Sequence, residues 1–471
     1  MAETKTRGQE LAEELLCNDK NGWESIPETE KKSAIRFCDG YIRFLNECKT
    51  ERECVSYAVQ KAEDAGFKPL SKVKTLKAGD KVYFVNREKN IILAVIGSKK
   101  ISEGVNVVGA HIDSPRLDLK PNPLYEDTGF AYLKTHYYGG IKKYQWVTMP
   151  LAIHGVVALK NGKTVNIVAG DEDDDFTFVI TDLLPHMARR QMEKKLSEGI
   201  EGEDLNLLIG NMPYADDKIK EKVKLNIMRI LNEKFGIVEK DFLSAELEIV
   251  PALKAKSLGF DRSMVAGYGQ DDRVCSYGAL QAIMQTENPE KTAICILVDK
   301  EEIGSVGNTG MEARFFETFL GELIRLRKEE TDLNVLNRAL AASRMLSADV
   351  DGAFDPIYAS VSERRNASYF GMGVGLNKYT GARGKSGAND ANAEFVAELR
   401  KLFDDNKVRF QISELGKVDE GGGGTIAYIL ANKGMDVIDC GTPVLSMHSP
   451  YEVTSKLDVY MSYKAYKVFM K

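Results

Sequence analysis

The chain has 471 residues, of which 43% are hydrophobic and 28% are charged, and its formal net charge is −6. This length exceeds one ordinary hydrophobic core, so we expect at least two domains of a globular protein. The acidic balance argues against a nucleic-acid partner, no apolar run is long enough to cross a membrane, and the charged, amphipathic start does not resemble a signal peptide.

Cysteine and histidine usage narrows the metal chemistry that the chain can support. The seven cysteines are scattered and form no CxxC pair, which fits reduced thiols better than disulfides or a thiolate metal site. We therefore expect a cytoplasmic protein. Histidine is scarce, so the setting of each one is informative: His111, His136, His154, His186 and His448.

The first part of the chain predicts helices and then strands. Residues 7–66 favour helices, because apolar residues recur at three- and four-residue steps. From Lys81 the pattern changes to strand-like runs, and the third of these, VNVVGA, leads into His111. His111 and Asp113 are two residues apart and so share one side of an extended chain, where Asp113 can fix the imidazole tautomer or support a metal site directly. A simple polar turn is the alternative.

Residues 119–249 differ in character and predict a second domain, inserted between residues 1–118 and 250–471 of the main domain. They contain an aromatic-rich stretch at 132–146, a hairpin pattern around Asn161-Gly162, and a charged amphipathic helix over 214–236. The aromatic side chains fit either a protein–protein surface or an internal core.

Further polar residues follow predicted buried strands in the last part of the chain. The apolar run 294–298 predicts a strand buried on both faces, and Glu301 and Glu302 lie just past its carboxyl end, where open α/β sheets place ligands. A solvated acidic loop is the alternative. Asp272 lies in a glycine-flanked loop at a helix start, where N-capping is the simpler role. Asp349 follows a short apolar run, and His448 follows a strand.

Together these residues predict a dinuclear metal site. The candidate ligands are two imidazoles and three carboxylates: His111, Asp272, Glu302, Asp349 and His448. Such ligands suit zinc, manganese or cobalt, and one bridging carboxylate gives each of two divalent ions three protein ligands. Two such ions lower the pKa of a bridging water. Glu301 lies beside a ligand but is spare, so we expect it to be the general base that takes the proton of this water and passes it to a leaving amine.

Five motifs, in order along nearly the whole chain, resemble those of the aspartyl aminopeptidase (aminopeptidase I) family of dinuclear zinc metallopeptidases. They are GAHIDSPRLDLKPNPLYE, GQDDRVCSY, VDKEEIGS, LSADVDGA and CGTPVLSMHSPYEV. The resemblance implies an aminopeptidase acting on peptides with a free N-terminus. It also implies a doubly wound, mixed-sheet α/β metallopeptidase domain that carries a smaller, β-rich dimerisation domain.

The resemblance further assigns the ligands to the two ions. By this resemblance His111 and Asp349 bind one ion, and Glu302 and His448 hold the other. Asp272 is the bridging carboxylate. Zinc is the implied metal, with cobalt and manganese as alternatives.

A further functional residue is implied in the inserted domain. His186 follows Pro185 in LLPHMARRQ, a setting similar to that of the family's histidine that reaches from the dimerisation domain into a neighbouring active site. The assembly that the resemblance implies is a tetrahedral homododecamer built from dimers, with inward-facing active sites. An ordinary surface histidine is the alternative for His186.

The substrate preference stays open at this stage. The stretches IKKYQWVTMPLAIHG and NKYTGARGKSGAND depart from the eukaryotic aspartyl pattern. A bacterial relative with a broader or different substrate preference is therefore at least as consistent with the sequence as an enzyme that prefers acidic N-terminal residues. Two other functions are alternatives for the same set of residues. One is a different dinuclear hydrolase, such as a carboxypeptidase or N-deacylase, and the other is a metal-free scaffold. Every ligand candidate and Glu301 are present, which argues against the scaffold.

Overall fold

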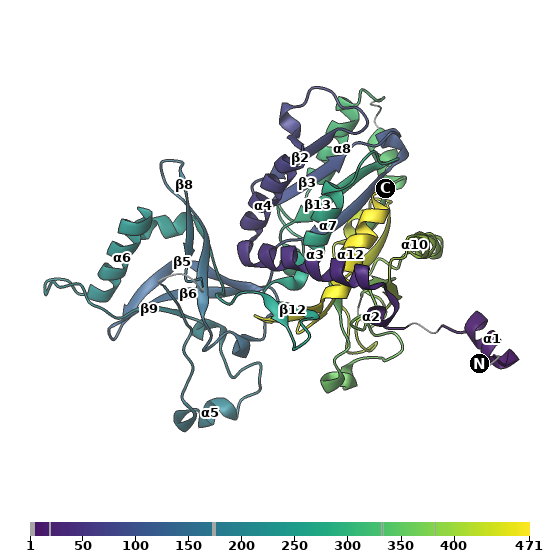
Figure 1. Cartoon of the computed structure of the whole chain (residues 1–471). Coiled ribbons are helices and arrows are strands. Elements are labelled where there is room, and N and C mark those ends of the chain that lie inside the picture. Colours follow the sequence, from purple (N-terminus) through teal and green to yellow (C-terminus); the bar gives the residue numbers. More distant parts are fainter. Residues whose placement is uncertain (1–4, 18–19, 172–175, 331, 333, 382) are drawn as a thin grey trace.

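The computed structural model describes residues 5–17, 20–171, 176–330, 332, 334–381 and 383–471. Figure 1 shows a large body of helices around a sheet and a β-rich lobe beside it. The predicted α/β class is confirmed by this architecture. No helix of the described residues is both long and apolar enough to cross a membrane.

A nine-stranded mixed sheet forms the centre of the large body. Its strands, in spatial order, are β1 (Lys68–Pro69), β2 (Lys81–Asn86), β3 (Asn90–Val95), β13 (Thr292–Val298), β4 (Val105–His111), β14 (Arg344–Ser347), β18 (Asp436–Gly441), β16 (Val374–Asn377) and β17 (Phe410–Ile412). The four central strands β13, β4, β14 and β18 run parallel. Strands β3, β4 and β13 are buried at every position, as near-continuous apolar runs predict for strands covered on both faces.

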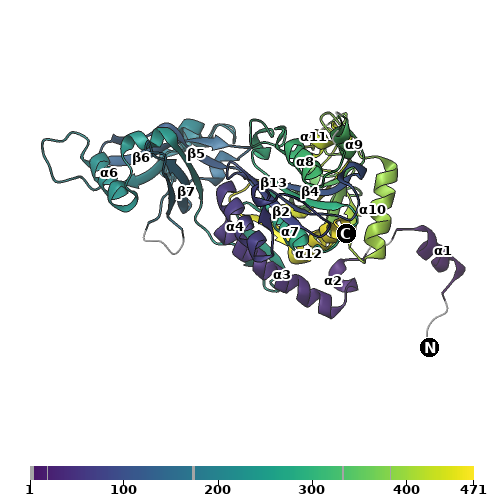
Figure 2. The ribbon, with the colours of Figure 1, turned by 90° about the horizontal axis from the view of Figure 1, so that it is seen from above.

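Helices cover both faces of this sheet (Figure 2). One face packs against α3 (Glu28–Glu47), α4 (Glu51–Asp64), α7 (Gln270–Met284), α10 (Ala393–Asp405) and α12 (Lys456–Phe469). The other face packs against α8 (Phe315–Leu326), α9 (Val335–Ala341) and α11 (Ala427–Ala431). Each face has its own hydrophobic core, so the doubly wound arrangement expected for this domain is present.

The start of the chain is helical, but not all of it joins the core. Helices α3 and α4 pack on the sheet, whereas α1 (Arg7–Leu15) has no buried residue and extends away from the body (Figure 1). The short α2 (Gly22–Ser25) lies between α1 and α3.

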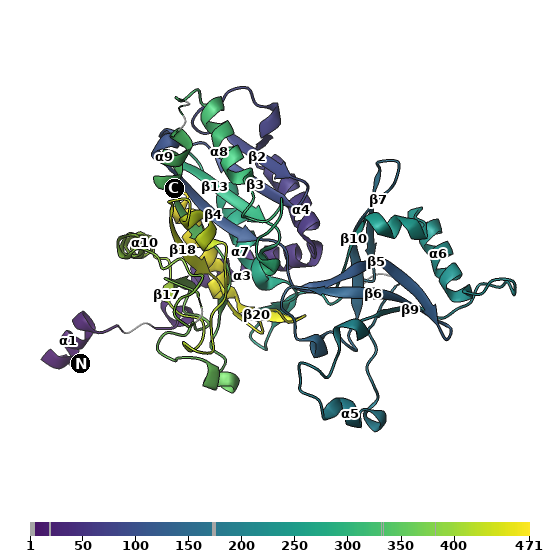
Figure 3. The same cartoon turned by 180° about the vertical axis from the view of Figure 1, so that it is seen from behind.

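The lobe beside the body is built on a six-stranded antiparallel sheet (Figure 3). Its strands, in spatial order, are β8 (Thr164–Ala169), β7 (Leu151–Ala158), β10 (Ala245–Pro251), β5 (Arg116–Asp127), β6 (Phe130–Tyr138) and β9 (Leu207–Gly210). The expected boundaries of the inserted domain, at residues 118/119 and 249/250, fall inside β5 and β10. Strands β7 and β8 pair as a hairpin, and Gly162 in its turn has φ 83°, a conformation that glycine adopts readily.

The helix of this lobe is shorter than its amphipathic pattern suggested. Helix α6 begins at Lys222 and ends at Phe235, where Gly236 caps it in the left-handed conformation. Upstream, the backbone N–H of Tyr214 donates to the carbonyl of Lys222, so the polar residues between them form a turn region and not a helix.

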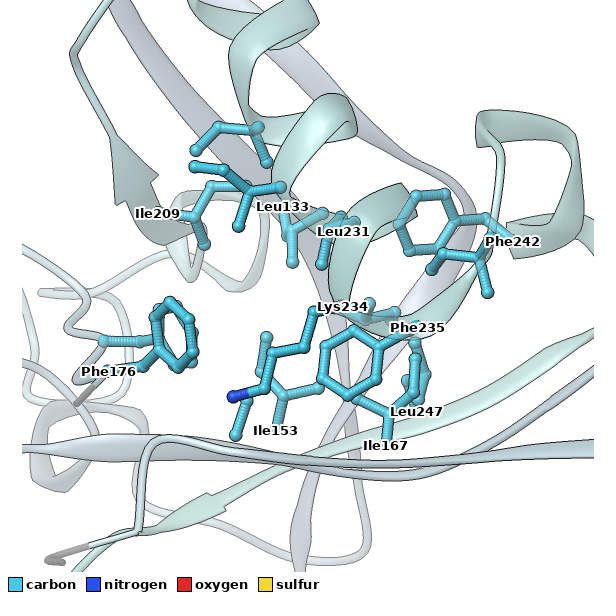
Figure 4. A pocket seen from close by; sticks show the side chains of 16 residues that line it. Leu133, Ile153, Ile167, Phe176, Ile209, Leu231, Lys234, Phe235, Phe242 and Leu247 are labelled. Atoms are coloured by element: carbon cyan, nitrogen blue, oxygen red, sulfur yellow. The ribbon is translucent and has the colours of Figure 1, made fainter. Parts of the chain in front are cut away.

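The core of the lobe lies between α6 and the six-stranded sheet. Apolar side chains from both elements meet there around a cavity of about 110 Å³, with Lys234 at its border, 4.2 Å from the ring centre of Phe176 (Figure 4). The aromatic stretch 132–146 contributes to this core in part, and a protein–protein surface at its exposed side chains stays a prediction. Trp146 is fully buried, whereas Tyr137 and Tyr144 are 44% and 41% exposed.

A third, five-stranded sheet lies at the junction of body and lobe. It consists of β11 (Lys256–Leu258), β12 (Met264–Gly267), β20 (Glu452–Ser455), β19 (Pro443–Leu445) and β15 (Asp351–Gly352). The connection between β19 and β20 carries His448, so this sheet positions one of the predicted ligands.

Candidate metal centre

Neighbouring parallel strands end at one edge of the nine-stranded sheet, and predicted ligands follow them directly. His111 closes β4 and pairs with Val298, the last residue of β13. The 3-10 turn η7 (Glu301–Ile303) comes after β13, and Asp349 comes two residues after β14. Because the carboxyl ends of adjacent parallel strands lie side by side, these side chains meet above the sheet.

His111 is buried, and its two ring nitrogens face different partners. Nδ1 lies 3.1 Å from the backbone oxygen of Asp113 and 3.2 Å from its carboxylate Oδ1. Nε2 lies 3.1 Å from Asp271 Oδ1, 3.8 Å from Asp349 Oδ1 and 3.9 Å from Glu301 Oε2. A proton on Nδ1, held by Asp113, leaves Nε2 as a ligand atom directed at the carboxylates.

The two adjacent aspartates at the start of α7 occupy different places. Asp271 lies between the imidazoles, with Oδ1 3.1 Å from His111 Nε2 and Oδ2 3.2 Å from His448 Nε2. Asp272, predicted from the sequence to bridge two ions, accepts a hydrogen bond from the backbone N–H of His111 at 3.2 Å. Potential ligands gather in two groups, one with each aspartate: His111, Asp272 and Asp349, and His111, Asp271 and Glu302.

Asp113 also holds the backbone that carries the glutamate pair. The N–H of Glu301 donates to Asp113 Oδ1 and the N–H of Glu302 donates to Asp113 Oδ2, each at 3.2 Å. The Glu302 side chain faces the other imidazole, with Oε2 3.6 Å from His448 Nε2. The two glutamates therefore present their carboxylates to different histidines.

The lobe contributes directly to the site. The Tyr138 hydroxyl, at the end of β6, donates to Asp113 Oδ2 at 2.8 Å. The carbonyl of Gly140 lies 2.8 Å from His448 Nδ1, which leaves Nε2 of that histidine facing the carboxylates. Neither residue was predicted to belong to the site, and the sequence around them, Tyr138-Gly139-Gly140, carries no specific chemical motif.

Glu452 is a second residue whose position was not predicted. Its Oε1 accepts from the backbone N–H of His448 at 2.8 Å, and its Oε2 accepts from the backbone N–H of Gln270 at 2.6 Å. Strand β20 thus fixes both the His448 loop and the start of α7 through one buried carboxylate. Glu452 lies four residues beyond the predicted ligand His448, but that spacing alone carries no chemical meaning.

The electrostatics of the site favour a bound cation. Six carboxylates surround two imidazoles: Asp113, Asp271, Asp272, Glu301, Glu302 and Asp349. Burial raises the pKa of Glu301 to about 7, with neighbouring carboxylates adding to the shift. Burial also raises the pKa of Glu302 and Asp349 well above their usual range. Although burial opposes it, Asp271 and Glu302 raise the pKa of His448 to about 10.

One carboxylate oxygen of a predicted ligand, Oε1 of Glu302, is buried without a hydrogen-bond partner among the described residues. Leaving a buried, charged oxygen unpaired is costly. Divalent cations remove this cost, and imidazole together with carboxylate ligands suits zinc. The residues present therefore fit a zinc site.

The site opens into a cavity of about 560 Å³. Asp271, Glu301, Glu302, Asp349 and His448 lie on its wall, together with the glycine-rich segment 422–424. The remaining lining contains one further carboxylate, Asp351, and is otherwise neutral or apolar, with Val350, Leu415, Tyr428 and Met447 among its residues.

His186 is not part of this cavity. It lies on the 3-10 turn η4 (Pro185–Met187), exposed to solvent, on the long loop of the lobe that also carries α5 (Arg189–Met192) and extends away from the sheet (Figure 3). Within the described part of a single chain, the cavity lining does not include His186.

Comparisons with known proteins place the chain among metallopeptidases. Residues 44–470 match the family model described as aminopeptidase I zinc metalloprotease (M18). A probable M18 family aminopeptidase 1 from Clostridium acetobutylicum is 54% identical over 464 residues, which covers 98% of this chain and 100% of that protein. The crystal structure of an M18 family aminopeptidase from Thermotoga maritima superposes with a TM-score of 0.93 at 45% identity, over 97% of this chain and 99% of that one.

A more distant structure shares the fold. The mApe1 dodecamer from S. cerevisiae has a TM-score of 0.75 at 22% identity, over 94% of this chain and 97% of that one.

Proposed function

The chain belongs to the aminopeptidase I zinc metalloprotease family (M18), and on that premise we propose that its site holds two zinc ions and uses Glu301 as the general base. It is a zinc aminopeptidase and therefore a hydrolase, as predicted from the sequence. The observation that carries the proposal is the position of Asp271 between His111 Nε2 and His448 Nε2.

We assign the ligands from this geometry. His111 and Asp349 hold one ion, while Glu302 and His448 hold the other. Asp271, with one oxygen toward each imidazole, would be the bridging ligand. The family resemblance had implied Asp272 in this role. Asp272 then acts from behind the site, where its carboxylate fixes the backbone of His111.

Zinc ions bound there would lower the pKa of a water molecule and polarise the carbonyl of the scissile peptide bond. Glu301 lies at the cavity wall and is not needed as a ligand, so its carboxylate is free to accept a proton from the attacking water. The water oxygen bonds to the carbonyl carbon, the C–N bond breaks, and Glu301 delivers the proton to the leaving amine nitrogen. Asp113 positions Glu301 through the backbone hydrogen bond to its N–H.

The substrate is a peptide with a free N-terminus. The carboxylates at the cavity wall complement an α-ammonium group, and the neutral lining around them offers room for the first side chain. The preferred side chain is left to experiment.

The active form is a homo-oligomer, which we propose to be a tetrahedral dodecamer built from dimers. The yeast neighbour with this fold is a dodecamer. Around His186, the side chains of Leu183, Leu184 and Met187 are 51%, 50% and 70% exposed, and such an apolar patch is typical of a surface that a second subunit covers. His186 is then supplied to the active site of a neighbouring subunit.

We also propose a cytoplasmic location. All seven cysteines are free thiols, and six of them are buried. Reduced cysteines are the rule in that compartment.

An amino-acid p-nitroanilide panel, read with zinc, cobalt and manganese in turn, tests the function. We expect metal-dependent release of nitroaniline from free amino-acid anilides and none from N-acetylated ones. Activity on N-acyl amino acids or on free C-termini, without anilide hydrolysis, would contradict the proposal.

A further inference from the structure

A row of buried polar side chains crosses the nine-stranded sheet beside the active-site cavity. Ser347 of β14 pairs with Asp439 of β18, and Asp439 pairs with Asn377 of β16. Directly paired residues of adjacent strands point to the same face. Ser413 extends the row, because its hydroxyl donates to Asp351 Oδ2 at 2.5 Å and lies 3.0 Å from Asn377 Oδ1. We call these five residues the polar row.

The row holds two carboxylates without a counter-charge. Asp351 and Asp439 are 1% and 2% exposed. Among the described residues, neither makes an ion pair within 4.0 Å, and both oxygens of Asp439, Oδ1 of Asp351 and the hydroxyl of Ser347 have no hydrogen-bond partner. Burial raises the pKa of Asp439 to about 6 and the nearby Asp351 carboxylate adds to the shift, while the neighbouring hydroxyls of Thr425 and Ser347 oppose it.

Unpaired buried charge and unpaired buried oxygens are both costly, and one bound cation relieves both. The chemistry of the row selects the class of cation. Its potential ligands are carboxylate, hydroxyl and amide oxygens, with no imidazole or thiolate among its five members, which suits a hard ion and not zinc. Two carboxylates among neutral oxygens offer less charge than a typical calcium site.

The row is also accessible. The active-site cavity is lined by two members of the row, Asp351 and Asn377, and by Thr425, which is not a member. The cavity provides an entry path from solvent. The row is distinct from the two ligand groups at the zinc centre, neither of which includes Asp351 or Asp439.

We propose that the polar row binds one monovalent alkali cation, potassium or sodium, separately from the zinc ions. The bound ion would link strands β14, β18 and β16, through Ser347, Asp439 and Asn377, to Ser413 in the segment after β17. It thereby stiffens the wall of the substrate cavity that Asn377 and Thr425 form.

Thermal unfolding of the zinc-loaded enzyme tests this inference. Tm is measured at constant ionic strength in KCl, NaCl and choline chloride. We expect Tm to rise by at least about 1 °C in one alkali salt over choline, with a saturable dependence on its concentration. Asp439→Asn, which keeps the shape of the side chain and removes its charge, is expected to abolish the difference between salts.

Asp458→Asn is the matched control. Asp458 is equally buried, but its two oxygens accept from the backbone N–H groups of Gly371 and Gly373 at 2.7 Å and 2.8 Å. This variant is expected to lose stability by the same amount in every salt and to keep the alkali effect.

Crystals soaked in rubidium or thallium salts locate the ion. An anomalous peak among Ser347, Asn377 and Asp439, absent from Asp439→Asn, is the expected result. Equal Tm in all three salts together with no peak at the row would overturn the inference and would mean that the buried acids are protonated instead. Zinc content, measured for each variant, separates this outcome from a failure of the zinc site.

Discussion

At the scale of single residues, Glu301 and Glu302 are adjacent in the chain but face different imidazoles. Glu302 is a proposed zinc ligand, whereas Glu301 is not needed as a ligand. Replacing each glutamate with glutamine should therefore have different effects. Glu301→Gln is expected to retain both zinc ions and lose several orders of magnitude in kcat, since the attacking water has no proton acceptor. Glu302→Gln is expected to lose zinc.

Metal analysis of the purified variants, together with kcat at saturating zinc, distinguishes the two roles. Zinc loss in Glu301→Gln with full occupancy in Glu302→Gln would reverse the assignment within the pair.

Asp271 and Asp272 form a second adjacent pair with separable roles. Asp271→Asn weakens the ligand between the two imidazoles, so we expect zinc to fall from two ions per chain to one or fewer. Asp272→Asn leaves that ligand in place and is expected to keep more zinc. Zinc titration followed by mass spectrometry under native conditions counts the ions in each variant. Full occupancy in Asp271→Asn, with loss in Asp272→Asn, would restore Asp272 as the bridge.

The sequence was sufficient to predict where most site residues lie, and the structure shows the physical reason. His111, Glu301, Glu302 and Asp349 each follow a buried strand, and parallel strands bring such positions together. The choice between Asp271 and Asp272 was not predictable, because it depends on the direction in which an irregular backbone turns at the start of α7. The roles of all these residues remain predictions.

At the scale of secondary-structure elements, a buried histidine joins α4 to the lobe. Nδ1 of His154, in β7, lies 2.8 Å from the Glu53 carboxylate of α4. Nε2 of the same ring lies 3.1 Å from the carboxylate of Asp171, which follows β8. Lys49 also contacts Asp171, at 2.8 Å. Burial lowers the pKa of His154, but the two carboxylates outweigh it and raise this pKa to about 9.

The sign of the resulting pH dependence follows from linkage. A histidine whose pKa is about 9 when folded and ~6.5 when unfolded stabilises the fold fully below pH ~6.5. This contribution is lost as pH rises from there through 9. We therefore expect His154→Gln to reduce the free energy of unfolding most at pH 6, with a difference from the unmodified chain that shrinks toward pH 9.

Urea unfolding at pH 6, 7, 8 and 9, with zinc held constant, measures this difference. His136→Gln is the control, because His136 lies exposed on β6 of the same sheet, and it is expected to change the unfolding midpoint little at any pH. A constant cost of His154→Gln across the range would show that its ion pairs do not contribute.

Element positions followed from local patterns, but the contacts between elements did not. The apolar runs of β3, β4 and β13 and the period of α3 were visible in the sequence, since burial imposes them directly. The extent of α6 was overestimated because charged residues upstream continue a helical pattern although the backbone turns there. The contact of Tyr138 in β6 with Asp113, in the connection between β4 and β5, joins residues that are 25 positions apart, and no local pattern encodes such a pairing.

At the scale of the whole molecule, the position of His186 sets the last prediction. Its loop extends from the lobe into solvent, and its own active-site cavity does not include it. If a neighbouring subunit's His186 completes each site, the imidazole is placed to stabilise the developing oxyanion, and one well-aimed donor contributes ~3–4 kcal/mol to such a transition state. His186→Ala is then expected to lower kcat by about 100- to 1,000-fold with zinc content unchanged.

Subunit mixing tests whether the histidine acts between chains. His186→Ala and Glu301→Gln chains, each nearly inactive alone, are dissociated, mixed and reassembled. Sites that combine an intact Glu301 from one chain with an intact His186 from another regain activity, so for random mixing at equal amounts we expect about a quarter of the unmodified activity, by the statistics of independent pairing. Mixed oligomers of normal size that regain no activity would contradict the sharing of His186 between subunits. A fully active His186→Ala homo-oligomer would contradict it too, because the exposed loop would then have no part in the reaction.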